Sequence, residues 1–152
     1  MASTLESLSV LTGSRPPTFV PNTPSRLRAA RTCYDHLAGS VGVLLHDRLK
    51  ALGWIFSGVT DAEAAYDVTP DGTKALGALG IDLEAVRALR RRFAYACLDW
   101  SERRSHLGGA LGAAVLKIAL QRKWVTQDLD SRALEVTSKG RREMLARFGL
   151  WV

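Results

Sequence analysis

Each half of the sequence carries a thiol, a carboxylate and an imidazole within a short stretch of chain. Thiolate and imidazole are the ligands that zinc and related soft divalent metals prefer, although the spacing differs from that of a zinc finger. An organic effector that contacts the same side chains, and a purely structural polar network, remain alternatives. The candidate metal- or effector-binding residues are Cys33, Asp35 and His36 in the first half and Cys97, Asp99, Glu102 and His106 in the second half.

These two clusters need elements that bring them together. Cys33 and His36 are three residues apart and could share one face of a helix. Asp99 and Glu102 have the spacing of a capping box, which predicts a helix that begins near Trp100. A duplicated fold could then join the clusters across a pseudo-two-fold axis. The candidates for lining a pocket beside them are Tyr34 and Trp100.

An internal repeat is the most informative pattern in the chain. Gly39-x-x-Gly42 followed by Trp54 recurs, at one constant offset, as Gly109-x-x-Gly112 followed by Trp124. The pentapeptide at 68–72 similarly recurs at 136–140. We predict an N-terminal stub and Pro-rich linker in residues 1–24, a first unit over 25–82 and a second unit over 83–152.

Local patterns predict the elements of each unit. Apolar residues at three-and-four spacing predict a helical region over residues 25–52. Short strands at 54–56 and 66–68 would form a hairpin, and Thr69-Pro70 supplies the N-cap and first-turn proline of a helix that ends near Gly80. The expected fold class is mainly α with small β-hairpins (α+β), built from tandem duplicated winged-helix-like units.

Two segments resemble the paired signatures in the C-terminal half of a bacterial ArsR-type winged-helix regulator subfamily. They are residues 30–39, Ala-Arg-Thr-Cys-Tyr-Asp-His-Leu-Ala-Gly, and residues 97–112, which begin Cys-Leu-Asp-Trp. The resemblance implies transcription regulation, with this chain as the effector-sensing and dimerisation part. It implies as partners a second copy or a full-length homologue, DNA, and a metal or small-molecule effector, with zinc or another soft divalent metal as the cofactor to consider.

In that family a separate DNA-binding winged helix precedes this region, joined to it by a helix and a Pro-rich linker. The present chain begins at what resembles the stub of that helix, so we expect the main DNA-reading domain to be absent. A stand-alone winged-helix DNA-binding protein is the alternative. Its candidate DNA contacts are His46, Arg48 and Lys50 on the first recognition-like helix and Lys139, Arg141 and Arg142 after the second hairpin.

The helix expected over 113–120 is too apolar for a DNA groove, so both recognition-like helices could instead belong to a core or a dimer interface. A net charge of +6 favours a polyanionic partner.

Two cysteines are too few for a disulfide scaffold, the first residues do not resemble a signal peptide, and the longest apolar run is too short to cross a bilayer. We therefore expect a cytoplasmic protein without a membrane partner. No hydrolase, metalloprotease or phosphate-loop motif occurs, so we expect no enzyme.

Overall fold

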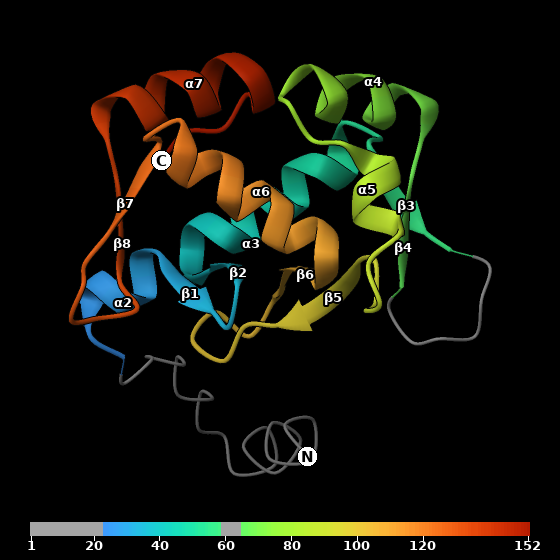
Figure 1. The fold of residues 1–152 in the computed structure, drawn as a ribbon. Helices are drawn as coiled ribbons and strands as arrows, with labels where there is room; N and C mark the ends of the chain where they lie inside the picture. Colours follow the sequence, from blue (N-terminus) through green and yellow to red (C-terminus); the bar gives the residue numbers. More distant parts are fainter. Residues whose placement is uncertain (1–22, 59–64) are drawn as a thin grey trace, which may run out of the picture.

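The computed structural model describes residues 23–58 and 65–152, in which one order of elements occurs twice (Figure 1). Helix α2 (Ser25–Ala29) precedes the first copy, and α5 (Leu83–Arg87) separates the copies. The first copy comprises β1 (Arg31–Cys33), β2 (His36–Ala38), α3 (Gly39–Ala51), β3 (Ile55–Ser57), β4 (Tyr66–Val68) and α4 (Pro70–Ala78). The second comprises β5 (Tyr95–Leu98), β6 (Ser105–Gly108), α6 (Gly109–Gln121), β7 (Val125–Gln127), β8 (Leu134–Val136) and α7 (Ser138–Phe148).

The predicted fold class is confirmed, because the described residues form helices and two-stranded antiparallel hairpins, and the two alternate except where α4 is followed directly by α5. The hairpin predicted from 54–56 and 66–68 is present as β3 and β4. The predicted N-cap is also present, since Thr69 Oγ1 accepts a hydrogen bond from Gly72 N at 3.0 Å. Thr137 caps α7 in the same way through Gly140 N. Except for residues 23 and 24, the predicted stub and linker lie outside the described residues.

The continuous helical region predicted over 25–52 is wrong. Helix α2 ends at Ala29, the β1–β2 hairpin follows, and α3 begins only at Gly39. Tyr34 makes the hairpin turn with a left-handed φ of 56°. The local apolar period is overridden by pairing with the other copy, because Thr32 N donates to Arg132 O at 2.9 Å.

The helix predicted to begin near Trp100 is also absent, because residues 99–104 form the turn between β5 and β6. The carboxylate of Asp99 accepts hydrogen bonds from the backbone N–H groups of Ser101 and Glu102, at 3.0 and 3.2 Å. An aspartate that bonds the backbone just ahead of it stabilises a turn as readily as a helix start. Here the chain turns back at Arg103, whose φ is 55°.

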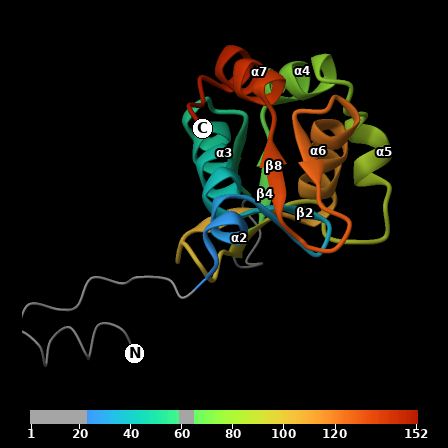
Figure 2. The same ribbon diagram turned by 90° about the vertical axis from the view of Figure 1, so that its left-hand side faces the viewer.

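The two copies interlock. Figures 1 and 2 show α3 and α6 side by side in the middle, with α4 and α7 above them and the β1–β2 and β5–β6 hairpins below. Helix α3 packs on β6 and α6 packs on β2, so each central helix contacts the hairpin of the other copy. Tyr66 N donates to Ala94 O, and Leu134 N donates to Ala30 O, both at 3.0 Å. These bonds join the second hairpin of each copy to the chain just before the first hairpin of the other.

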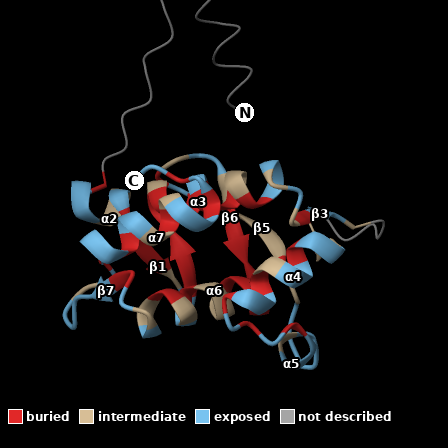
Figure 3. Ribbon diagram, turned by 90° about the horizontal axis from the view of Figure 1, so that it is seen from above, coloured by how far each residue is buried: buried red, intermediate tan, exposed pale blue. Residues whose placement is uncertain are grey.

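A shared core lies between these layers. Leu49, Leu76, Leu111 and Met144, two from each copy, are each 1% exposed and belong to one hydrophobic cluster. Figure 3 shows buried residues concentrated on the inner faces of the helices and on strands of the central hairpins. In the described part of the chain, no helix combines the length and apolar character needed to span a membrane.

We predict opposite effects for two glycine substitutions on α4. A Cβ at Gly72 would lie 2.2 Å from Trp54 O, whereas one at Gly77 would have no described atom within 4 Å apart from the neighbouring backbone of its own helix. Gly72→Ala should therefore lower the free energy of unfolding by about 1–3 kcal/mol through overpacking. The matched control Gly77→Ala should raise it by about 0.4–1 kcal/mol, because alanine restricts the unfolded chain. Equal thermal unfolding midpoints for the two variants would contradict the close approach of α4 to Trp54.

Candidate functional site

The first hairpin of each copy holds a cysteine opposite a histidine. Cys33 on β1 pairs with His36 on β2, and Cys97 on β5 pairs with His106 on β6. Directly opposed residues of an antiparallel pair present their side chains on the same face. Cys33 and His36 therefore share a face of a hairpin, and the prediction that they share a face of a helix is wrong.

The four side chains meet where the two hairpins face each other. One ligating atom from each of Cys33, His36, Cys97 and His106 lies within 4.8 Å of the other three. The two imidazole Nε2 atoms are 3.0 Å apart, and the ring centroids are 5.0 Å apart. The histidines are buried, while both cysteines are half-buried. The facing hairpins thus bring these members of the two predicted clusters together.

Carboxylates orient both imidazole rings. Nδ1 of His106 is 3.0 Å from Oδ2 of Asp99, and Nδ1 of His36 is 3.4 Å from Oδ1 of Asp35. With each Nδ1 facing a carboxylate, each Nε2 is directed into the space between the hairpins. Asp35 is itself held at the surface by an ion pair with Arg91. Two of the predicted carboxylates therefore lie behind the imidazoles.

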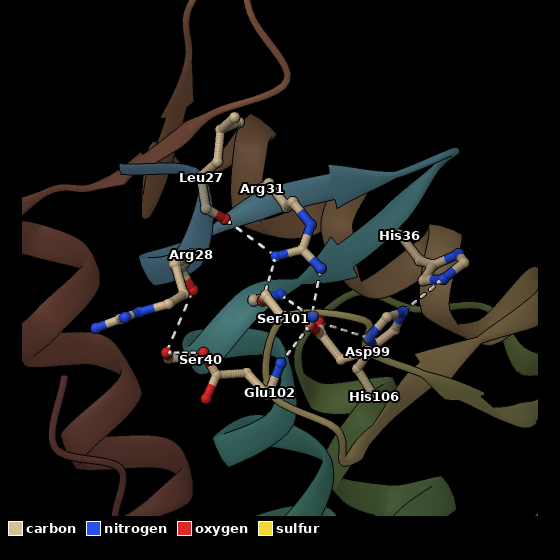
Figure 4. A network of polar contacts seen from close by, with 10 residues as sticks. Leu27, Arg28, Arg31, His36, Ser40, Asp99, Ser101, Glu102 and His106 are labelled. Atoms are coloured by element: carbon tan, nitrogen blue, oxygen red, sulfur yellow. Dashed lines mark hydrogen bonds and ion pairs between the residues drawn. The ribbon is translucent and has the colours of Figure 1, made fainter. Parts of the chain in front are cut away.

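Asp99 is the centre of a buried polar network that joins the two copies (Figure 4). Its carboxylate is fully buried and pairs at 2.8 Å with the guanidinium of Arg31, which is 1% exposed. It also accepts hydrogen bonds from Gly39 N at 2.7 Å and from Ser101 Oγ at 2.8 Å. Arg31 makes further bonds, to Ser101 Oγ at 2.8 Å and to Leu27 O at 3.1 Å. The network thereby fixes the start of α3 and of β1 against the β5–β6 turn.

Burial and these contacts shift the pKa values of Asp99, His36 and Cys97. Burial opposes ionisation of Asp99, but hydrogen bonds from His106, Arg31, Gly39 and Ser101 together hold its pKa far below its usual range. Burial, together with the neighbouring His106, lowers the pKa of His36. Burial, together with the nearby Cys33 thiol, raises the pKa of Cys97 to about 11. His36 and Cys97 are therefore held in their neutral forms at neutral pH.

Three other predicted site residues lie beside the cluster. Glu102 accepts a hydrogen bond from Ser40 Oγ at 2.8 Å, so it faces the first turn of α3. Tyr34 is 94% exposed at the hairpin tip and lines an open hollow against α6. Trp100 is about half exposed, and its ring lies 4.3 Å from the guanidinium carbon of Arg31. Trp100 thus covers the outer side of the buried ion pair.

The predicted DNA contacts divide into two groups. His46 is buried and hydrogen-bonded to the hydroxyl of Tyr66 at 2.7 Å, and Arg48 Nε donates to Phe148 O at 2.8 Å at the end of α7. The prediction that His46 reads DNA does not fit its burial, because its side chain offers no surface to a partner. The remaining four residues, Lys50, Lys139, Arg141 and Arg142, are exposed.

Several residues that support the site are not predictable from the sequence alone. Arg31 and Ser101 carried no signal, because nothing in their neighbourhood marks them as partners of Asp99. The repeated glycines, by contrast, were visible in the sequence as part of the internal repeat. A Cβ at Gly112 would lie 3.1 Å from the Cβ of His36, and one at Gly42 would lie 3.6 Å from that of His106. The closest atoms belong to the hairpin of the same copy, because a Cβ would lie 2.5 Å from Leu37 O at Gly42 and 2.4 Å from Leu107 O at Gly112. The glycines therefore let each central helix start close to its own hairpin, and Gly112 also leaves space for His36.

Comparison with known proteins relates the chain to a transcriptional regulator. YdfF of Bacillus subtilis (strain 168), an uncharacterized HTH-type transcriptional regulator, is 42% identical to this chain over 115 residues. The aligned region covers 76% of this chain and 49% of YdfF, so the chain spans about half the length of this relative. No protein-family model matches the chain, and no solved structure matches it.

We predict that removing the Asp99 carboxylate strongly destabilises the fold. Asp99→Ala leaves Arg31 buried without its counter-charge, which should cost about 3–5 kcal/mol of unfolding free energy. Asp67 provides a matched control, because its ion pair with Arg87 is close to half exposed on both sides. Asp67→Ala should cost at most about 1 kcal/mol. The measurement is denaturant unfolding of both variants, and similar midpoints would contradict the importance of the buried network.

Proposed function

We propose that this chain is the effector-sensing and self-association part of a bacterial transcriptional regulator of the ArsR type. Its similarity to an HTH-type regulator over 76% of its length supports a role in transcription. The observation that carries the sensing role is the position of the cysteine–histidine cluster, which draws on both copies of the repeat. A ligand bound there would bias the packing of one copy against the other.

The central helices are poor candidates for reading DNA. Helix α3 presents His46 to the core and uses Arg48 to bond the C-terminal end of α7. Helix α6 is apolar over most of its length and is buried at positions that include Leu111 and Leu116. In this proposal, the helix that reads DNA belongs to another part of the regulator or to a partner, either a second copy or a longer homologue. The regulator would act in the cytoplasm and without catalysis.

One observation favours the alternative of a stand-alone DNA-binding protein. Lys139, Arg141 and Arg142 are exposed together near the N-terminal end of α7, directly after the β7–β8 hairpin. A basic helix start beside a hairpin is suited to phosphate contacts. The net charge of +6 would add to the attraction.

We predict that the purified chain binds duplex DNA only weakly and without sequence preference. Fluorescence anisotropy with labelled random duplexes should show binding at low salt that is lost at physiological salt, because it depends on counterion release alone. The triple variant Lys139→Ala, Arg141→Ala, Arg142→Ala should weaken this low-salt binding no more than a control with the same loss of charge. The control substitutes Lys74, Arg90 and Lys117 by alanine, since these exposed residues lie outside α7 and the β7–β8 hairpin.

The opposite result would overturn the proposal that another part of the regulator, or a partner, reads the DNA. Binding that persists at physiological salt with a shallow salt dependence, and that is lost in the α7 triple variant only, would identify the chain itself as the DNA reader.

A further inference from the structure

We propose that the chain binds one divalent metal ion of the zinc class in a tetrahedral site between its β1–β2 and β5–β6 hairpins. The ligands are the Sγ atoms of Cys33 and Cys97 and the Nε2 atoms of His36 and His106. Binding rests on this cluster alone, and only the use of the metal as an effector rests on the proposed function.

The distances suit a tetrahedral ion. With Zn–N bonds of about 2.0–2.1 Å and Zn–S bonds of about 2.3 Å, the ligand atoms of a tetrahedron are about 3.3–3.8 Å apart. The two Nε2 atoms are 3.0 Å apart, and every pair of ligand atoms in the set lies within 4.8 Å. Small side-chain rotations would therefore complete the site without moving a hairpin.

The charge of the ligand set also suits a dication. Two thiols lose their protons on binding, and two imidazoles stay neutral, so the buried complex of a divalent ion with two thiolates carries no net charge. This neutrality limits the cost of placing an ion where the histidines are 2% and 0% exposed. Thiolate and imidazole select zinc and similar soft metals over magnesium or calcium, which need oxygen ligands.

The surroundings hold the ligands in place. Asp35 and Asp99 face the Nδ1 atoms of the imidazoles, which is the usual arrangement behind metal-bound histidine. Four protein ligands complete a tetrahedron, so no position remains open for a reacting water, as expected of a structural or sensing site. The half-buried cysteines lie on the accessible side, which gives the ion a path of entry.

The cluster contains most of the cysteine and histidine side chains of this chain. The sequence holds two cysteines and three histidines. Both cysteines and two of the histidines meet at one point, although the copies that supply them are far apart in the chain. The third, His46, is as well buried but bonds Tyr66. It therefore supplies a matched control for the effect of losing a buried imidazole.

The test is a metal titration of the full chain, reduced and freed of metal by a chelator. Co²⁺ should bind at one ion per chain and produce the intense visible bands of a tetrahedral ion together with thiolate-to-cobalt charge transfer. Zn²⁺ should displace it and raise the thermal unfolding midpoint. Substoichiometric binding, or a cobalt spectrum without thiolate charge transfer, would overturn the proposal.

Variants assign the ligands. Cys33→Ser should weaken the charge-transfer band and the affinity for Zn²⁺. Asp35→Asn, at an exposed position, should weaken Zn²⁺ binding by about 10–100-fold through the orientation of His36. His46→Gln should leave the stoichiometry and the spectrum unchanged. Equal losses of metal binding in His46→Gln and Cys33→Ser would overturn the ligand assignment.

A measurement on the unmodified chain keeps the proposal testable if a variant fails to fold. Zn²⁺ should protect both thiols from alkylation, and a chelator should restore their reactivity. Thiols that react at the same rate with and without Zn²⁺ would overturn the site. Because none of these measurements involves DNA, failure of the regulator proposal and failure of the metal site are distinguishable.

Discussion

The buried Asp99 carboxylate is the constraint on which the rest of this structure depends. A charge that is fully removed from water is tolerable only when hydrogen bonds and a counter-charge surround it. Asp99 obtains these from Arg31 and the N-terminus of α3 in one copy, and from Ser101 and His106 in its own. The hydrogen bonds and ion pair of the Asp99 carboxylate therefore fix how the two copies pack against each other. The cysteine–histidine cluster lies at this contact between the copies.

The two copies supply matched ligands, but the surroundings of these ligands are unequal. Asp35 occupies the position in the first copy that Asp99 occupies in the second, yet Asp35 stays half exposed and pairs with Arg91 at the surface. The longer turn between β5 and β6 contributes Ser101, which helps to enclose Asp99. One imidazole is thus anchored in the core, and the other is anchored near solvent. The site therefore combines His106, which is held by the buried Asp99, with His36, which is held by the half-exposed Asp35.

The sequence predicted the features that depend on neighbouring residues. Thr69-Pro70 specifies a helix start through local geometry, and the structure has that start. The motifs that recur at a fixed offset also predicted a recurring order of elements, and the structure has that order twice. The helix over 25–52 failed because β1 forms hydrogen bonds to a segment about a hundred residues away, which no local period can reveal. The capping pattern at Asp99 failed for a similar reason, since its carboxylate serves Arg31 and Gly39 as well as its own turn.

The central claim is that two thiols and two imidazoles from the duplicated hairpins form one metal site. X-ray absorption at the zinc edge of the Zn²⁺-loaded chain tests it most directly, because it counts ligand types around the ion. The account predicts two sulfur ligands at about 2.3 Å and two nitrogen ligands at about 2.0–2.1 Å. A shell of nitrogen and oxygen without sulfur would contradict it, and would leave the cluster as a polar network that joins the two copies.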